Sequence, residues 1–457
     1  MKQKFIFSLV LCGLASFLAC GNSNPGTNRG PAVFPHRALI SNLTSSRIDV
    51  ADTTRDLLVT AISGDLPGRL LLSNDKKYTV SLSPQDFSVN LFANATQSGL
   101  GSANLSGQSS GVVLTVDNSL ILGPVPTEPG RVGEAPGALD VIAVGFSTNG
   151  TATSATLTRQ PSIFLPGVSS LAATPNTSAM LALSDAIQNP ANPNGPSGRV
   201  WAIQTSLVNT NQQPYQEAVS AVWDHPVFAV ASADNLSAYV LNCGPECGGS
   251  QASVVQVTFP TATNAPPVVG TPLPIPGGAT TAFLNGNTLY VAGSDPSASC
   301  GTTGFPPPCG ALTPVDLAAM TAGTPVIIAG GTHDRIAMGS NNLLFVGARG
   351  CDFVRDPANP LNGLGCLSLA NVVQFDQSTT KVAPPAAFTA PAMGPGNDDV
   401  TGMTPIANNG GESNQFYVIE AGELVIYDTK TGMVKSLPNI TLPNIIGQGV
   451  DVVAVDF

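Results

Sequence analysis

The chain has 457 residues, of which only 10% are charged, and it contains 47 Gly and 39 Pro. A typical soluble domain is about 25% charged, and so much Gly and Pro argues against long helices and favours short strands joined by turns. The formal charge is −11. Because no basic stripe interrupts this acidity, nucleic acid and anionic membrane surfaces are poor candidates for partners.

The first 20 residues have the features of an export signal. Lys2 and Lys4 precede an apolar run at residues 5–18, which is too short to span a membrane and ends in Phe17-Leu-Ala-Cys20. This pattern resembles a bacterial lipoprotein signal. The resemblance implies that Cys20 becomes the first mature residue and carries a lipid, and that Gly21 directs the protein to the outer membrane. The alternative is an ordinary secretory signal that is cut nearby.

The segment after the signal is expected to be a tether. Residues 21–35 are rich in Gly, Pro and Asn and show no apolar period. Residues 36–457 are then expected to form a single domain. No other apolar run approaches the roughly 18 residues that a spanning helix needs, so we expect the lipid to be the sole membrane attachment, in the cell envelope.

Groups of short strand-like runs repeat along this domain. In the clearest group, four apolar runs at residues 281–284, 289–292, 312–316 and 326–329 are separated by turns and a long loop. This spacing predicts a four-stranded antiparallel meander. First strands begin near residues 68, 111, 168, 226, 279, 335 and 399. A four-stranded unit repeated at this spacing predicts an all-β fold, a β-propeller.

The two ends of the domain supply one more group. Residues 449–457 fit a first strand, and residues 37–41 and 47–51 fit a second and a third strand. Pairing these segments would close the ring and remove the open sheet edge. Eight blades are therefore favoured, with seven as the alternative because residues 87–123 contain few turn signals. Trp201 and Trp223 are expected to pack between blades.

Three of the runs carry a family resemblance. Residues 289–292 (LYVA), residues 372–376 (VVQFD) and residues 424–428 (LVIYD) followed by Thr429-Lys-Thr-Gly432 resemble YVTN-type propeller repeats. Such repeats occur in bacterial envelope proteins and in lactonase-like propellers. The resemblance covers most of residues 37–457 and implies a fold more than a function, since propellers serve many functions.

Six cysteines remain after the signal, and they form three local groups. Six cysteines allow 15 pairings, but each group falls between the second and third strand of one blade. This placement predicts the disulfides Cys243–Cys247, Cys300–Cys309 and Cys351–Cys366, in keeping with an oxidising envelope. The alternative is a metal site, which three His residues in the whole chain and the cysteine spacing disfavour.

The residues that begin the blades should meet the disulfide loops on one face, at the mouth of a central channel. Many of them are charged, titratable or polar: Asp224, His225, His333, Asp334, Arg335, Asp398, Asp399, Gln448 and Asp451. Their convergence predicts a binding site on this face. The structural alternative is that the Asp and His side chains hydrogen-bond neighbouring strands, as in WD-type repeats.

Three functions follow from these patterns. The favoured one is a non-catalytic, monomeric, lipid-anchored propeller without a cofactor, which binds a protein or glycan through the channel-mouth face. A second is a lactonase-like hydrolase that uses His333, Asp334 and Arg335, or a Ca²⁺ or Zn²⁺ ion held by Asp334, Asp399 and Asp451. A third is a structural scaffold in outer-membrane assembly. The sequence has no Gly-x-Ser-x-Gly elbow and no Gly-rich phosphate loop, which weighs against the enzyme classes that use them.

Overall fold

The structure, a computed structural model, describes residues 36–456 except 44–45, 55, 64–67, 84, 131–132, 150–151, 261, 263–264, 295–308, 352–365, 374, 376–380, 383–398, 407–413, 421 and 436–448. Residues 35–457 form one compact unit. Its regular structure is nearly all strand, with two short 3₁₀ helices in the described residues, η1 (Thr205–Leu207) and η2 (Gly244–Cys247). Within these residues no helix has the length and apolarity to cross a membrane.

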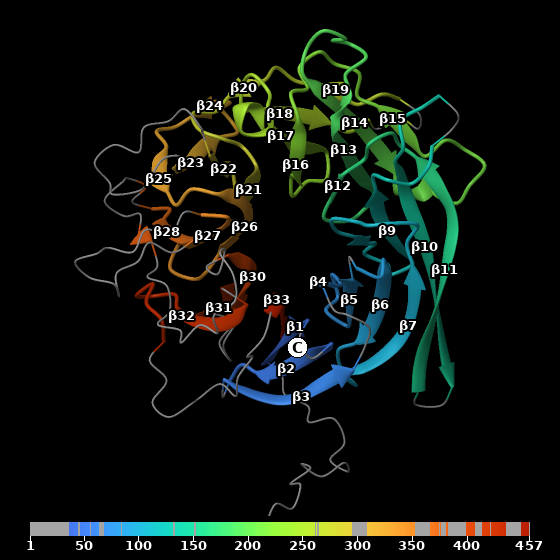
Figure 1. Cartoon of the computed structure of the whole chain (residues 1–457), viewed down its shortest axis with the longest axis vertical. Helices are drawn as coiled ribbons and strands as arrows, with labels where there is room; N and C mark the ends of the chain where they lie inside the picture. The colour runs from blue at the N-terminus through green and yellow to red at the C-terminus, as the bar shows by residue number, and fades with distance from the viewer. Residues whose placement is uncertain are drawn as a thin grey trace, which may run out of the picture. The chain divides into compact units, whose positions relative to one another are not determined.

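Eight antiparallel sheets are arranged in a ring, which Figure 1 shows face-on. Each sheet is one blade, and its strands follow the chain from the innermost strand outward, except in the blade whose innermost strand is β33. The predicted all-β propeller with eight blades is confirmed. We number the blades in chain order and give number 1 to the blade that contains the first and last strands.

The strands follow, innermost first. Blade 1 contains β33 (Gly449–Asp456), β1 (His36–Asn42), β2 (Arg47–Asp52) and β3 (Leu57–Ser63). Blade 2 contains β4 (Arg69–Leu72), β5 (Tyr78–Ser83), β6 (Ser88–Ala93) and β7 (Ser98–Asn104). Blade 3 contains β8 (Val113–Leu114), β9 (Leu120–Val125), β10 (Ala138–Asn149) and β11 (Ala152–Phe164). Blade 4 contains β12 (Ser170–Ala173), β13 (Ala179–Gln188), β14 (Ser197–Gln204) and β15 (Tyr215–Glu217).

The second half of the ring repeats the pattern. Blade 5 contains β16 (Pro226–Ala231), β17 (Ser237–Asn242), β18 (Ser253–Thr258), β19 (Val268–Val269) and β20 (Leu273–Pro274). Blade 6 contains β21 (Thr281–Asn285), β22 (Thr288–Ser294), β23 (Gly310–Asp316), β24 (Thr321–Ala322) and β25 (Val326–Ile328). Blade 7 contains β26 (Thr332–Met338), β27 (Leu343–Arg349), β28 (Leu367–Asn371) and β29 (Lys381–Val382). Blade 8 contains β30 (Val400–Ile406), β31 (Gln415–Glu420) and β32 (Glu423–Asp428), with a single further bridge from Tyr427 to Val434.

The predicted closure of the ring is confirmed. β33 pairs antiparallel with β1, from His36 opposite Asp456 to Asn42 opposite Gly449, so the last strand of the chain is the innermost strand of the blade that the first strands complete. The backbone hydrogen-bonding edge of β1 is thereby covered, as propeller closure requires.

A short polar motif forms the turn after several innermost strands. In blade 2, the Ser73 hydroxyl and the Lys77 N–H both donate to the Asp75 carboxylate, at 2.7 and 3.1 Å. Equivalent contacts recur around Asp117, Asn176 and Asp234 in blades 3, 4 and 5. An Asp or Asn side chain that binds the N–H two residues on mimics a backbone turn. The sequence Ser/Thr-x-Asp/Asn therefore sets the reversal between the first two strands.

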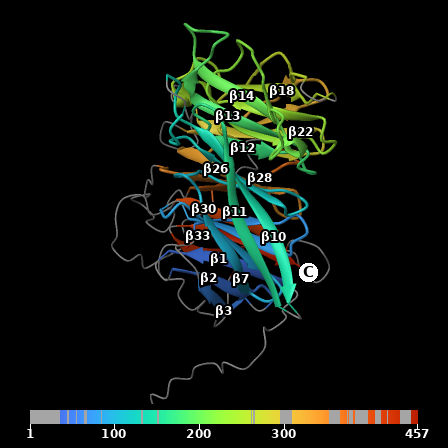
Figure 2. The ribbon, with the colours of Figure 1, turned by 90° about the vertical axis from the view of Figure 1, so that its right-hand side faces the viewer.

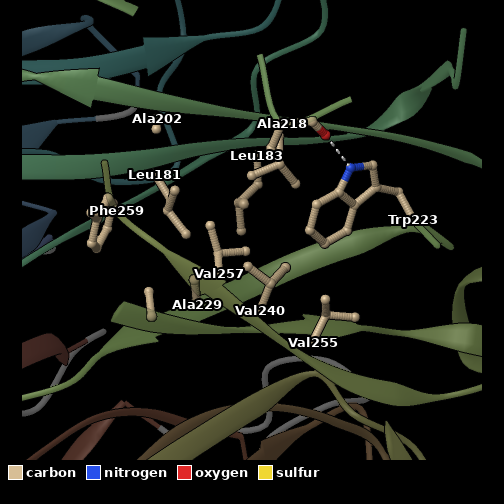
Figure 3. Packing of buried hydrophobic residues seen from close by; sticks show 12 residues of the cluster. Leu181, Leu183, Ala202, Ala218, Trp223, Ala229, Val240, Val255, Val257 and Phe259 are labelled. Atoms are coloured by element: carbon tan, nitrogen blue, oxygen red, sulfur yellow. Dashed lines mark hydrogen bonds between the residues drawn. The ribbon is translucent and has the colours of Figure 1, made fainter. Parts of the chain in front are cut away.

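The apolar core is divided into eight clusters, each of which lies between two neighbouring blades. Figure 3 shows the cluster between blades 4 and 5, in which Leu181 and Leu183 face Val240 and Val257. Trp223 belongs to this cluster and donates its indole N–H to the Ala218 carbonyl at 2.7 Å. Trp201 lies in the cluster between blades 3 and 4, so the predicted packing role of both tryptophans is confirmed.

Blade 3 ends in a hairpin longer than those of the other blades. β10 and β11 have 12 and 13 residues, and Figure 2 shows the two strands running beside each other at the side of the ring. The inner part of this hairpin belongs to the core, because Val141 and Ile142 are fully buried. β11 also packs against β7 of blade 2.

The run at residues 372–376 was expected from its apolar pattern to be the third strand of its blade, and this prediction was wrong. The third strand of blade 7 is β28 at Leu367–Asn371, which ends before Val372. Leu367 follows Cys366 directly, and Cys366 is disulfide-bonded to Cys351 beyond the end of β27. The third strand therefore begins immediately after the disulfide. Val372 and Val373 lie in a bend that follows the end of this strand.

Candidate binding site at the ring axis

The starts of innermost strands bring charged side chains from distant parts of the sequence together. Asp451 on β33 accepts a hydrogen bond from the Leu70 backbone N–H on β4 at 3.0 Å, and it lies close enough to Arg335 on β26 for their charges to interact. These strands belong to blades 1, 2 and 7. Arg69, Asp334, Arg335, Arg349 and Asp451 form a group that we call the axial cluster.

Asp334 is the centre of this cluster. Its Oδ2 atom lies 2.6 Å from Arg349 Nη2, 3.5 Å from Arg335 Nη1 and 3.5 Å from Arg69 Nη2. Arg335 and Arg349 belong to blade 7 with Asp334, whereas Arg69 comes from blade 2, on the other side of blades 8 and 1. The ion pair of Arg69 with Asp334 therefore joins parts of the ring that share no sheet.

A backbone irregularity places Asp334 at this position. In the pairing of β26 with β27, His333 lies opposite Ala348 and Arg335 opposite Gly347, so Asp334 is an extra residue without a partner on β27. Such a bulge bends the strand and turns one side chain away from the regular alternation. β30 has a similar bulge at Thr401, and the Thr401 carbonyl accepts a hydrogen bond from Arg335 Nε at 2.8 Å.

The cluster carries an excess of positive charge. Burial and the nearby Arg335 lower the pKa of Arg69, but arginine stays protonated at neutral pH. Burial raises the pKa of Asp451, against the opposing effect of Arg335, so this carboxyl group holds its negative charge less readily than an exposed aspartate. Three guanidinium groups thus surround one closely paired carboxylate.

The arginines remain partly open to solvent. The side chains of Arg69 and Arg349 are 39% and 45% exposed, and that of Arg335 is 18% exposed. Arg335 is also fixed by its bonds to Thr401 and to the carbonyl of Asp334. A guanidinium fixed by hydrogen bonds beside two more exposed ones is suited to holding a ligand with several acceptor oxygens.

His333 lies apart from this cluster. Its side chain is buried, and its Nε2 atom hydrogen-bonds the Ala329 carbonyl at 2.9 Å. Burial lowers the pKa of His333 to about 4, although Ala329 and Asp334 act in the opposite direction. The imidazole is therefore neutral at pH 7 and packed inside the blade. The hypothesis of a catalytic group formed by His333, Asp334 and Arg335 does not fit this geometry.

Asp224 and His225 hold a loop. Asp224 accepts hydrogen bonds from the Ser250 N–H at 2.8 Å and the Gln251 N–H at 3.0 Å, and it contacts His225 Nδ1 at 3.0 Å. Burial opposes ionisation of Asp224, but these contacts outweigh it and lower the pKa. The pair thus secures the segment between β17 and β18, as the structural alternative in the sequence analysis describes.

The disulfides lie at the same ends of their blades. Cys243–Cys247 closes η2 after β17, and Cys351–Cys366 joins the ends of β27 and β28. Cys309 is also disulfide-bonded, but its expected partner Cys300 lies outside the described residues. Glu246, inside the first bridge, accepts a hydrogen bond from the Ser294 N–H of blade 6 at 2.7 Å.

Asp399 is the one remaining predicted residue of this face that the structure describes. Asp399 accepts a hydrogen bond from the Gly350 N–H at 2.7 Å, while Asp398, Gln448 and Cys20 lie outside the described residues. In the part of the chain that the structure describes, no group of three or more His, Cys, Asp or Glu side chains could hold a metal ion. Arginines also surround Asp334, which makes the proposed cation site of Asp334, Asp399 and Asp451 electrostatically unfavourable.

Sequence reasoning missed two members of the cluster, Arg69 and Arg349. Arg69 begins β4 and therefore occupies the same position in its blade as the residues that were selected. Arg349 ends β27, immediately before a disulfide loop. The position of Arg69 at the start of an innermost strand was therefore a signal present in the repeat.

The whole-chain comparisons concern the fold. No known protein family and no curated protein matches the sequence. The solved structure of dihydro-heme d1 dehydrogenase NirN in complex with DHE is similar with a TM-score of 0.62 and 10% identity, over 94% of this chain and 77% of that one. The structure of apo AztD from Citrobacter koseri is similar with a TM-score of 0.54 and 13% identity, over 92% of this chain and 97% of that one. At such identities the likeness extends to the β-propeller fold alone.

Proposed function

We propose that the chain is a non-catalytic binding propeller of the bacterial envelope, anchored by a lipid on Cys20. It binds a protein or glycan partner through the face of the ring that carries the axial cluster and the disulfide loops. The observation that carries this proposal is the axial cluster itself, in which Arg69, Asp334 and Asp451 meet from three different blades.

The geometry favours binding over hydrolysis. A general base must reach a proton of the substrate or of a water molecule, whereas the imidazole of His333 is buried and bonded to Ala329. The Asp334 carboxylate is already engaged in ion pairs with Arg69 and Arg349. A scaffold in outer-membrane assembly would bind its partner through the same face. The identity of the recovered partner distinguishes this scaffold role from other binding functions.

The binding face is tested by blocking it sterically. Pro245 lies exposed in η2 between β17 and β18, whereas Ala233 lies exposed in the turn at the opposite end of β17. Pro245→Trp places a bulky side chain on the proposed face, and Ala233→Trp is the matched control on the other face. Chemical crosslinking in the intact envelope, followed by mass spectrometry, should recover the same partner with the wild type and Ala233→Trp but not with Pro245→Trp. Equal recovery with all three chains would contradict the proposal.

The anchor is tested separately. Cys20→Ser should move the chain from the membrane to the soluble fraction, because it removes the thiol that carries the lipid. Cys12→Ser, a change within the apolar run of the signal, is the control and should leave the chain at the membrane. Fractionation followed by mass spectrometry of the mature N-terminus checks both, and a membrane-bound Cys20→Ser chain would remove the lipid from the proposal.

A further inference from the structure

We propose that Arg69, Arg335 and Arg349 form an anion site that takes a carboxylate or phosphate group of the ligand. This inference rests on the proposed binding function and specifies the chemistry that the face recognises. A chain with a formal charge of −11 repels anions over most of its surface, so a local excess of arginine on the proposed face requires an explanation.

The charge balance of the cluster differs from that around three other described arginines. Arg47 pairs with Asp49, Arg199 pairs with Glu217, and Arg159 contacts both Glu128 and Asp140. In each case the carboxylates equal or outnumber the guanidinium groups. In the axial cluster this ratio is reversed, because three guanidinium groups meet two carboxyl groups, and all three form their ion pairs with the same one, Asp334.

The guanidinium groups also retain hydrogen-bond donors. Each has five N–H bonds, and Arg335 uses two of its own on the carbonyls of Thr401 and Asp334. The guanidinium groups of Arg69 and Arg349 donate no well-aligned hydrogen bond within the described residues, and neither oxygen of Asp334 receives one from these side chains. The cluster is therefore held by charge and leaves directed N–H groups for another acceptor.

Arginine in this arrangement suits acceptors with two or three oxygens. The planar fork of a guanidinium group binds a carboxylate or a phosphate through two parallel hydrogen bonds. Asp334 already shows that the three side chains converge around a carboxylate. A second anionic group would reduce the repulsion between the arginines and would contact Arg69 and Arg349, the two most exposed of them.

Isothermal titration of the full chain tests the site directly. Inorganic phosphate and citrate are the probes, glucose is the neutral control, and NaCl keeps the ionic strength constant because screening weakens such contacts. We expect saturable binding of at least one anion. Arg69→Gln and Arg349→Gln should each weaken the affinity about tenfold, the effect of losing one charged hydrogen bond.

The matched control is Arg47→Gln. Arg47 is 46% exposed, which is close to the exposure of Arg349, and it pairs with Asp49 on blade 1. This variant should bind the anion as the wild type does. Asp334→Asn should bind more tightly, because it removes the resident negative charge that opposes the ligand. Circular dichroism of each variant confirms that the fold is retained.

The outcomes separate the two anions and the two proposals. Binding of phosphate alone assigns a phosphate-bearing ligand, and binding of citrate alone assigns a carboxylate-bearing one. Absence of saturable binding, or unchanged affinity in both Arg69→Gln and Arg349→Gln, overturns the anion site. If Pro245→Trp still abolishes partner recovery in that case, the proposed function stands. Anion binding together with unchanged partner recovery would instead reject the proposed function.

Discussion

Burial controls the ionisation of Glu246. Its carboxylate lies in η2 and accepts the Ser294 N–H at 2.7 Å, so it connects the disulfide loop of blade 5 to blade 6. Burial raises its pKa from 4.5 to about 7, more than the hydrogen bond from Ser294 lowers it. The folded chain therefore holds this proton more tightly than the unfolded chain does.

Stability should depend on pH through this residue. Because the folded-state pKa is the higher one, the contribution of Glu246 is fully present below pH 4.5 and is lost as pH rises to about 7. The stability of the wild type relative to Glu246→Gln should fall over this range by at most about 3 kcal/mol. Urea denaturation of both chains at pH 5 and pH 8 measures the difference.

His333 gives the free energy of unfolding an opposite pH dependence. The comparison of the wild type with Glu246→Gln removes this effect. Its lowered pKa of about 4 means that protonation destabilises the fold, so its contribution increases as pH rises from about 4 to 6.5. Both chains contain His333, and the effect cancels in their difference. A pH-independent difference between the wild type and Glu246→Gln would contradict the assignment to Glu246.

Trp223 is the largest side chain in the core between blades 4 and 5. It is 1% exposed and bonded to Ala218, so Trp223→Ala should lower the free energy of unfolding by about 3 to 5 kcal/mol through the cavity that it leaves. Val219 lies nearby in sequence but is 65% exposed. Val219→Ala should change stability by less than about 0.5 kcal/mol. Denaturant unfolding of both variants measures the two changes in stability. Equal losses of stability in both variants would contradict the prediction.

At the scale of strands, most of the architecture could be predicted because its signals are local. The turn after an innermost strand depends on a side chain two residues from its backbone partner, as at Asp75 and Lys77. The third strand of blade 7 was misplaced because Cys366, not the apolar pattern, sets its start. A disulfide can move the start of a strand even though the apolar pattern of the sequence, from which strands are predicted, stays the same.

The axial cluster could be predicted only in part. Regular alternation would place His333 and Arg335 on one side of β26 and Asp334 on the other, and the bulge at Asp334 changes this alternation. The contact between Arg69 and Asp334 depends on the width of the ring and the reach of a long side chain. Neither the width of the ring nor the reach of the side chain across it can be predicted from the spacing of residues along the chain.

β30 and β33 approach each other closely at Gly402. A Cβ atom at this position would lie 2.6 Å from both the Cα and the Oδ1 atoms of Asp451. Gly402→Ala should therefore displace Asp451, lower stability by about 1 to 3 kcal/mol and weaken anion binding. Gly145→Ala is the control, because the nearest atom to its Cβ would be the Thr156 carbonyl oxygen at 3.9 Å. Thermal denaturation and titration with phosphate and citrate compare the two, and similar results would argue against close packing at Gly402.

At the scale of the whole molecule, the ring depends on one strand pair. β33 gives blade 1 its innermost strand, and its side chains pack against blade 8 and blade 2 through Val452 and Val455. Removal of residues 449–457 should expose the edge of β1 and open both interfaces. We expect loss of cooperative unfolding and concentration-dependent association.

The control for this truncation is a chain that ends at Asp456, the last residue of β33. Light scattering coupled to size-exclusion chromatography, with thermal unfolding, distinguishes the two chains. A cooperative, monomeric chain without residues 449–457 would show that the other seven blades suffice for a closed fold. The chain ending at Asp456 should behave as the full chain does.

Closure by β33 also has a consequence for the order in which the molecule is made. Ribosomes synthesise β1 long before β33, so β1 waits for its inner neighbour while all the strands between them are made. A nascent chain that stops before β33 lacks the strand pair that closes the ring. A nascent chain that has not reached β33 thus exposes the edge of β1, which distinguishes it from a chain with a closed ring.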